Sequence, residues 1–340
     1  MSRRKCIWTS ISFAIAVFLA ESFLFLETPS AATRQDLLEG AKKEGEVVFY
    51  AGMTPSDLEL LRSKFQERYP FVKLKINRVG GGKMLSRVLT EARAGKYFAD
   101  VIQTNQFDLY TFRKNGTLDY YLSPEDSFYS NDVKDRGYWT SYQLLIRVLA
   151  YNTKAVPAAN LPKTYQDLLH PRWKNTMMLD PTKEEWLAGM LQIMGKEKGL
   201  KYMRDLSTQN IMLRDGNALR SQLVAAGEAA LDINMPMHTV EPLKKAGAPI
   251  DWTALGPVPA SMNGVAVSAR APHANAAKLL VDFVLSKEGQ QIVQGLGRVV
   301  TRSDLTPAGN IQKLTVVPVN PAAADTIQEY AKLLHDIFAK

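Results

Sequence analysis

Cysteine is nearly absent from this sequence, and Cys6 is the only one among 340 residues. Cys6 lies in a short N-terminal segment that has the pattern of a removable leader, so the remaining chain carries no thiol. This composition excludes a cysteine nucleophile and a thiolate metal site, and it suits an oxidising compartment in which stray thiols mispair. Cys6 also precedes the apolar part of the leader, so it is not placed like a lipidated cysteine.

The motifs of common hydrolases and phosphate-handling enzymes are missing as well. The sequence contains no H-E-x-x-H pattern, no glycine-rich loop followed by Lys-Ser/Thr, and no Ser-His-Asp set in a recognised motif. Only four histidines are present, and none forms a ligand-spaced pair. These absences argue against an enzyme and give no reason to expect a cofactor or a metal site.

Runs of basic residues are also lacking. The chain carries a net charge of +8, yet its Lys and Arg are spread out, with no run of five and no interleaved aromatic platform. Nucleic acids and acidic membranes are attracted by clustered positive charge, so neither is expected as a partner. The charge is consistent with a solvated basic surface or, more sharply, with an anionic ligand.

Long apolar runs are missing too, and the N-terminus shows why this matters. Residues 3–5 are basic, residues 11–20 are apolar, and Ser30-Ala31-Ala32 supplies the small residues of a cleavage site. A membrane span needs about 20 apolar residues, and this run is too short. We therefore predict a signal peptide over residues 1–32, cleavage after Ala32 and a periplasmic mature protein.

The rest of the chain alternates between strand and helix patterns. Short apolar runs typical of buried strands are followed by stretches with apolar residues at helical spacing. This alternation predicts an α/β fold with a mostly parallel sheet covered by helices. The expected strands are 47–51, 72–79, 99–102, 144–151, 176–179, 229–233 and 264–267, and the expected helices include 184–194, 198–208, 218–226 and 274–294.

Several short segments occur along the chain in a characteristic order and spacing. They are Tyr50-Ala51-Gly52, Ala99-Asp100-Val101-Ile102, Leu149-Ala150-Tyr151-Asn152-Thr153, residues 161–169, Pro171-Arg172-Trp173-Lys174, residues 271–277 and residues 285–291. Each segment is a weak signal alone, but the ordered set covers nearly the whole mature chain. The set resembles the extracellular solute-binding proteins of ABC importers, and among them the ferric-iron-binding type.

This resemblance implies a type II periplasmic-binding-protein fold, in which two α/β lobes are joined by two crossover strands. The crossovers are expected near residues 148–152 and 262–267. The first lobe then comprises residues 33–150 plus 267–340, and the second comprises residues 151–266. The resemblance also implies a small-molecule ligand in a cleft that closes by a hinge, and a permease and an ATPase as partners. We expect a monomer without enzymatic activity.

Helix starts supply the candidate ligand contacts. Thr54 precedes Pro55 as an N-cap residue, Thr182 and Glu185 have the spacing of a capping box, and Asn217 lies at the start of a further helix. Free N–H groups at such ends attract anions. Capping alone explains Thr54, but the resemblance puts four positions on the cleft wall, and these are Thr54, Asn105, Lys183 and Asn217.

The sequence departs from the ferric-binding type where that type has its iron ligands. The expected pair of tyrosines falls at Met237 and His238, and the acidic and histidine ligands fall at Asn105 and Thr54. Methionine is a soft ligand and histidine a borderline one, so this set does not suit Fe(III). We expect Met235 and Met237 to pack against an organic ligand, with His238 beside them.

Three hypotheses follow. The leading one is a binding protein for a small organic anion such as a carboxylate, a phosphonate or a phosphate ester. The second is a carrier of a metal or metal chelate that uses His238 and a carboxylate such as Glu184. The third is a secreted enzyme.

Overall fold

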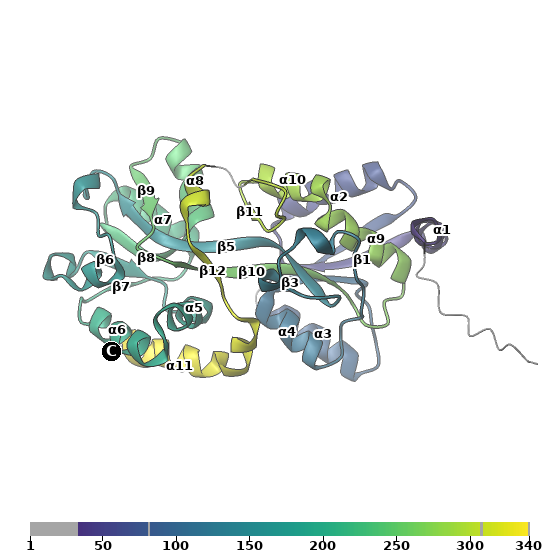
Figure 1. The fold of residues 1–340 in the computed structure, drawn as a ribbon, viewed down its shortest axis with the longest axis horizontal. Coiled ribbons are helices and arrows are strands. Elements are labelled where there is room, and N and C mark those ends of the chain that lie inside the picture. The colour runs from purple at the N-terminus through teal and green to yellow at the C-terminus, as the bar shows by residue number, and fades with distance from the viewer. Residues whose placement is uncertain (1–32, 81, 307–308, 339–340) are drawn as a thin grey trace, which may run out of the picture.

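The computed structural model describes residues 33–80, 82–306 and 309–338, so the predicted signal peptide and Cys6 lie outside the described residues. The described chain forms two α/β lobes that lie side by side along the long axis of the molecule (Figure 1). Each lobe has its own apolar core. Among the described residues, no helix is both long and apolar enough to cross a membrane.

The first lobe is built on three parallel strands, with β1 between β2 and β3. Its core contains Phe49 and Ile102 from these strands and Phe283 from a helix much later in the chain. The lobe is therefore discontinuous in sequence. Its elements are α1 (Arg34–Glu44), β1 (Glu46–Ala51), α2 (Pro55–Arg68), β2 (Lys73–Arg78), α3 (Lys83–Arg93), β3 (Val101–Asn105), α4 (Gln106–Lys114), β4 (Lys134–Asp135), α9 (Ala274–Leu285), α10 (Lys287–Gly295) and β11 (Val299–Val300).

The second lobe repeats the architecture with β6 parallel to both β7 and β8. Leu187 of α5 and Leu231 of β8 are fully buried in its core. Its elements are β6 (Met177–Leu179), α5 (Glu184–Met194), α6 (Lys196–Ser207), β7 (Met212–Leu213), α7 (Asn217–Ala226), β8 (Leu231–Pro236), α8 (Met237–Lys245) and β9 (Ile250–Thr253).

Two long strands, β5 (Trp139–Asn152) and β10 (Val258–Val267), run between the lobes (Figure 1). They pair with each other antiparallel, and β10 is also antiparallel to β3. The far end of β5 pairs with β8 and β9 of the second lobe. The sheet is therefore mixed instead of mostly parallel, because a strand that returns from the other lobe enters the sheet in the opposite direction. The predicted two-lobed α/β fold with two crossovers is confirmed.

The predicted start of α2 is confirmed. Thr54 is its N-cap residue, Pro55 follows at the first helical position, and Oγ1 of Thr54 accepts a 3.3 Å hydrogen bond from the N–H of Asp57. Proline suits this position because its missing N–H would have no helical partner.

The capping box predicted for Thr182 and Glu185 is wrong. The N-cap residue of α5 is Lys183, and its side chain makes no capping hydrogen bond. Oγ1 of Thr182 donates to Asp180 Oδ1 at 2.7 Å, while Glu185 accepts from Arg147 at 2.5 Å. Both side chains that the box requires are held by other partners.

The chain ends in a segment that contacts both lobes. We name residues 316–338 the C-terminal strap; it comprises β12 (Val316–Pro318), the 3-10 helix η7 (Pro321–Thr326) and α11 (Ile327–Phe338). β12 pairs with β10, η7 packs on α4, and α11 packs on α5 and α6. The sequence alone groups residues 267–340 with the first lobe but leaves open which lobe residues 311–340 pack against. α9 and α10 pack there, whereas the apolar side of α11 is buried in the second core.

Candidate functional site

A cavity of about 290 Å³ lies where the two lobes face each other. It is lined by Thr54 and Asn105, the N-cap residues of α2 and α4 in the first lobe, and by His238 of α8 in the second. The carboxyl ends of β1 and β3 lead directly into these helices. The cavity therefore has the position at which open α/β sheets bind ligands, beyond the carboxyl ends of their strands.

Several polar side chains at this cavity lack partners. Oδ1 of Asn105 accepts from two N–H groups of α4, at 2.9 and 3.0 Å, and within the described residues Nδ2 has no acceptor. In that same part of the chain, the side-chain amides of Gln143 and Asn263 and the ring of His238 make no hydrogen bonds. Polar groups that face a cavity without a protein partner are available to hydrogen-bond a ligand. Four such groups around one cavity make it a candidate site for a polar ligand.

His238 is a neutral group at this cavity. Burial lowers the pKa of His238 to about 4, and the nearby positive charges of Arg298 and Arg147 lower it as well. A neutral imidazole has one donor and one acceptor nitrogen. At neutral pH, His238 can therefore both donate to and accept from a ligand.

The charges at this first cavity, the smaller of two adjoining cavities, are balanced. Nη2 of Arg298 lies 3.3 Å from Oδ2 of Asp57, and both residues line the cavity. This pair leaves no net charge beside the N-terminus of α2. The remaining attraction for an anion comes from the N-terminal dipoles of α2 and α4 and from amide donors.

A second cavity of about 480 Å³ adjoins the first, and both are lined by Asn105, Leu145 and Asn263. It extends between α4 and α5 and contains Arg147, Glu184 and Glu185. Nη2 of Arg147 pairs with Glu185 at 2.5 Å, and Nη1 donates to the backbone oxygen of Asn234 at 3.1 Å. Burial raises the pKa of Glu184.

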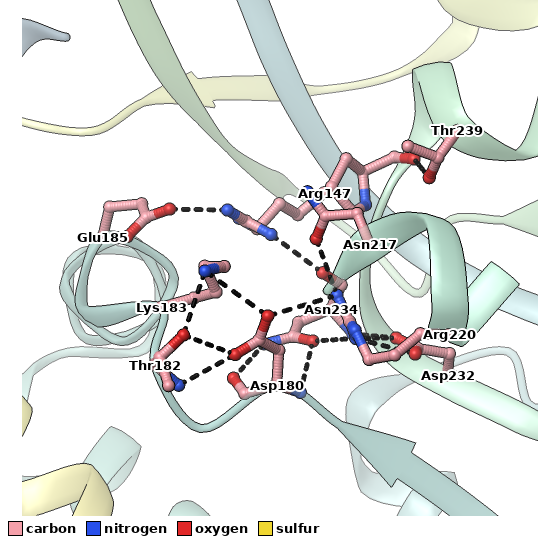
Figure 2. A network of polar contacts seen from close by, with 11 residues as sticks. Arg147, Asp180, Thr182, Lys183, Glu185, Asn217, Arg220, Asp232, Asn234 and Thr239 are labelled. Atoms are coloured by element: carbon pink, nitrogen blue, oxygen red, sulfur yellow. Dashed lines mark hydrogen bonds and ion pairs between the residues drawn. The ribbon is translucent and has the colours of Figure 1, made fainter. Parts of the chain in front are cut away.

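A buried ionic network lies between the N-terminal ends of α5 and α7 (Figure 2). Nη1 of Arg220 bonds both carboxylate oxygens of Asp232 at 2.7 Å and Oδ1 of Asn234 at 2.8 Å. Asp180 lies 3.9 Å from the same guanidinium group. Arg220, Asp232, Asp180 and Asn234 are all 0% exposed. The network joins the ends of β6 and β8 to α7.

Lys183 and Asn217 belong to the edge of this network (Figure 2). Nζ of Lys183 lies 3.0 Å from Oγ1 of Thr182 and 3.4 Å from Oδ2 of Asp180. Oδ1 of Asn217 accepts from Arg220 at 3.1 Å. Neither Lys183 nor Asn217 lines either of the two cavities. Of the four predicted anion contacts, Thr54 and Asn105 are brought together with His238, and the other two are held by protein groups.

Met235 and Met237 point into apolar cores instead of the cleft. Met235 of β8 is 0% exposed and packs with Val240 and Ile250. Met237 is buried near the crossover strands with Ile146. Their packing partners are protein side chains, so we do not retain them as ligand contacts.

Comparison with known proteins decides the family. Residues 50–291 match the family described as bacterial extracellular solute-binding protein. The chain belongs to this family. This solute-binding protein is thus of the class that serves ABC importers, as the ordered sequence segments indicated.

Similar proteins share the fold of this solute-binding protein. The major ferric iron-binding protein of Neisseria meningitidis is 22% identical over 304 residues, which cover 84% of this chain and 89% of the relative. Iron-bound HitA from Pseudomonas aeruginosa has a TM-score of 0.74 and 22% identity, covering 86% of this chain and 99% of HitA. AfuA from Actinobacillus pleuropneumoniae, with fructose-6-phosphate bound, has a TM-score of 0.70 and 24% identity, covering 87% of this chain and 99% of AfuA. Their ligands differ in chemistry, so the family leaves the solute open.

The sequence did not reveal several cleft residues of this solute-binding protein. Arg147 carried the one usable signal, because it is the only charged residue of the strand β5. Gln143 and Asn263 lie on the crossover strands, where polar residues in a strand have no distinctive pattern. Arg298 approaches the cavity only through the late return of the chain to the first lobe.

Proposed function

We propose that this solute-binding protein works in the periplasm as a monomer. There it captures a small organic anion without chemical conversion and presents it to the permease and ATPase of an ABC importer. The supporting observation is the smaller cavity, where Nδ2 of Asn105 and the unpartnered side chains of Gln143, Asn263 and His238 surround the N-termini of α2 and α4. Neutral donors and helix dipoles suit an oxygen-rich anion, and unpaired amides suit hydroxyl groups on the same molecule. Carboxylates, phosphonates and phosphate esters fit this description.

The metal alternative has less support. It relied on His238 with a carboxylate such as Glu184, but His238 lines the smaller cavity and Glu184 the larger one. Within the described residues, no group of three or more His, Cys, Asp or Glu side chains is placed to hold a metal ion. Iron therefore enters the binding test below as a competing outcome.

The test is a thermal-shift panel of carboxylates, phosphonates, hexose phosphates and ferric salts, followed by calorimetric titration. We expect at least one organic anion to raise the melting temperature, because a ligand at 100 times its Kd adds about 2.7 kcal/mol to folded stability. Asn263→Leu should weaken binding of that anion about tenfold or more, since a hydrogen bond to a charged group contributes about 1.5–3 kcal/mol. Its ligand-free melting temperature should change little, because within the described residues the Asn263 side chain bonds to nothing.

The control for this variant is Gln222→Ala, an exposed amide on α7 that lines neither cavity. It should bind like the wild type. Stoichiometric ferric binding with a visible absorption band, and no response to any organic anion, would instead favour the metal carrier.

We further propose that export removes residues 1–32. The intact mass of protein recovered from the periplasm should correspond to a chain that begins at Thr33. Recovery of the uncleaved chain in the membrane fraction would refute this proposal.

A further inference from the structure

The C-terminal strap is fixed to the second lobe by its helix. Leu334 of α11 is 0% exposed and lies in the second core with Leu187 and Met203. Glu329, on the first turn of α11, forms an exposed ion pair of 3.6 Å with Lys196 of α6. Because α11 contributes to the core of this lobe, it moves with the second lobe as one body.

The same strap contacts the first lobe through the packing of η7 on α4 and, within the described residues, through the polar contacts of one side chain, Asp325. Oδ2 of Asp325 accepts from the hydroxyl of Tyr110 at 2.9 Å, and Oδ1 lies 2.8 Å from Nζ of Lys114. Both partners belong to α4, whose N-terminus lines the cavities. Asp325 is therefore a contact between the lobes and not within one of them.

No flexible linker separates the contact of the strap with the first lobe from its contact with the second. Asp325 belongs to η7, and α11 begins two residues later at Ile327. A helix rises about 1.5 Å per residue, so Thr326 and Leu334 are held roughly 12 Å apart. If the lobes separate on this side, the helix cannot lengthen. The contacts of Asp325 with α4 must then break.

The strap also closes one side of the larger cavity. Ala324, Ile327 and Gln328 line it opposite Arg147 and Glu184. Separation of the lobes would carry Ile327 and Gln328 away from α4 and open this wall. The segment lies beyond the residues that match the family, 50–291.

We propose that the C-terminal strap is a third link between the lobes, and that Asp325 is its latch. The latch restrains opening of the cleft by holding α11 against α4. Release of Asp325 from Tyr110 and Lys114 opens the wall of the larger cavity. Because the link acts beside the crossover strands, it limits the hinge motion that these strands permit.

The test measures the distance between the lobes in the ligand-free protein, so it does not depend on the identity of the solute. The chain from Thr33 onward has no cysteine, which allows spin labels at Thr90→Cys on α3 and Lys198→Cys on α6. Electron–electron double resonance then gives the distribution of distances across the cleft. We expect Asp325→Ala to raise the ratio of long to short distances about fivefold, the effect of losing one exposed ion pair and its hydrogen bond.

The matched control is Glu329→Ala, which removes an ion pair of similar exposure on the same strap. That pair lies within the second lobe, so the distances should match those of the wild type. Lys114→Ala removes the ion pair from the other side and leaves the Tyr110 hydrogen bond, so it should shift the distances in the same direction by a smaller factor, whatever happens to the stability of the Asp325 variant. Equal distributions for Lys114→Ala, Asp325→Ala and Glu329→Ala would overturn the proposal.

Discussion

Replacing Arg220 with leucine is expected to lower the free energy of unfolding by about 3–5 kcal/mol, the cost of leaving a buried charge without its partner. Arg220 is the only cation bonded to Asp232 within the described residues, and it also lies beside Asp180. Both carboxylates are 0% exposed. Burial raises the pKa of Asp232 to about 6 even with Arg220 present. Denaturant unfolding at pH 7.5, where Asp232 of the wild type is charged, measures the loss.

Two further variants separate the loss of this buried ion pair from a nonspecific loss of stability. Arg220→Leu combined with Asp232→Leu removes both charges and should recover much of the lost stability, because buried ion pairs are often replaceable by apolar groups. Lys201→Ala breaks an exposed pair with Asp205 and should change stability by less than about 1 kcal/mol. A loss below about 1 kcal/mol for Arg220→Leu would show that the network contributes little.

Acid should destabilise the protein through His238. Its pKa is about 4 in the folded protein and 6.5 without the surroundings of the fold. Between these values the unfolded chain binds a proton that the folded chain does not, so the stability from this group is present above pH 6.5 and is lost as the pH falls to 4. The loss amounts to about 3 kcal/mol, since one pKa unit corresponds to about 1.36 kcal/mol.

The measurement compares stability at pH 7 and pH 4 for the wild type and His238→Gln. The free energy of unfolding should fall by about 3 kcal/mol less in the variant than in the wild type between pH 7 and pH 4. Carboxylates contribute equally in both proteins, so their contributions cancel in this comparison. His335→Gln provides the control, because the His335 side chain is 76% exposed. An NMR titration in which the His238 ring protonates near pH 6.5 would contradict the expectation directly.

Local patterns were enough to predict individual elements of the fold. Residues 184–194 form a helix as predicted, and Thr54 caps α2. These features depend on neighbours a few residues away in the sequence, so the residue type at the cap and the spacing of apolar residues are enough to predict them. The ordered family segments supplied the arrangement of the two lobes, which no local pattern contains.

The candidate site could be predicted only in part, because the partners of long side chains are chosen in three dimensions. Lys183 was expected to face a ligand, yet it turns towards the buried charge of Asp180. Glu185 was expected to cap its own helix, α5, but Arg147 on the strand β5 is a charged and therefore stronger partner. Asn105 was predicted from the family resemblance, and it does line the cavity because it ends β3 and begins α4, which fix its place.

The discontinuous first lobe has a consequence for the order in which the protein can be assembled. Leu279 and Phe283 of α9 are part of the core that also holds Phe49. Because synthesis starts at the N-terminus, every strand from β6 to β9 is made before α9. The lobe that begins first cannot complete its interior until the other has been synthesised. The earliest third of the polypeptide must therefore wait with apolar surface uncovered, which is the state that chaperones recognise.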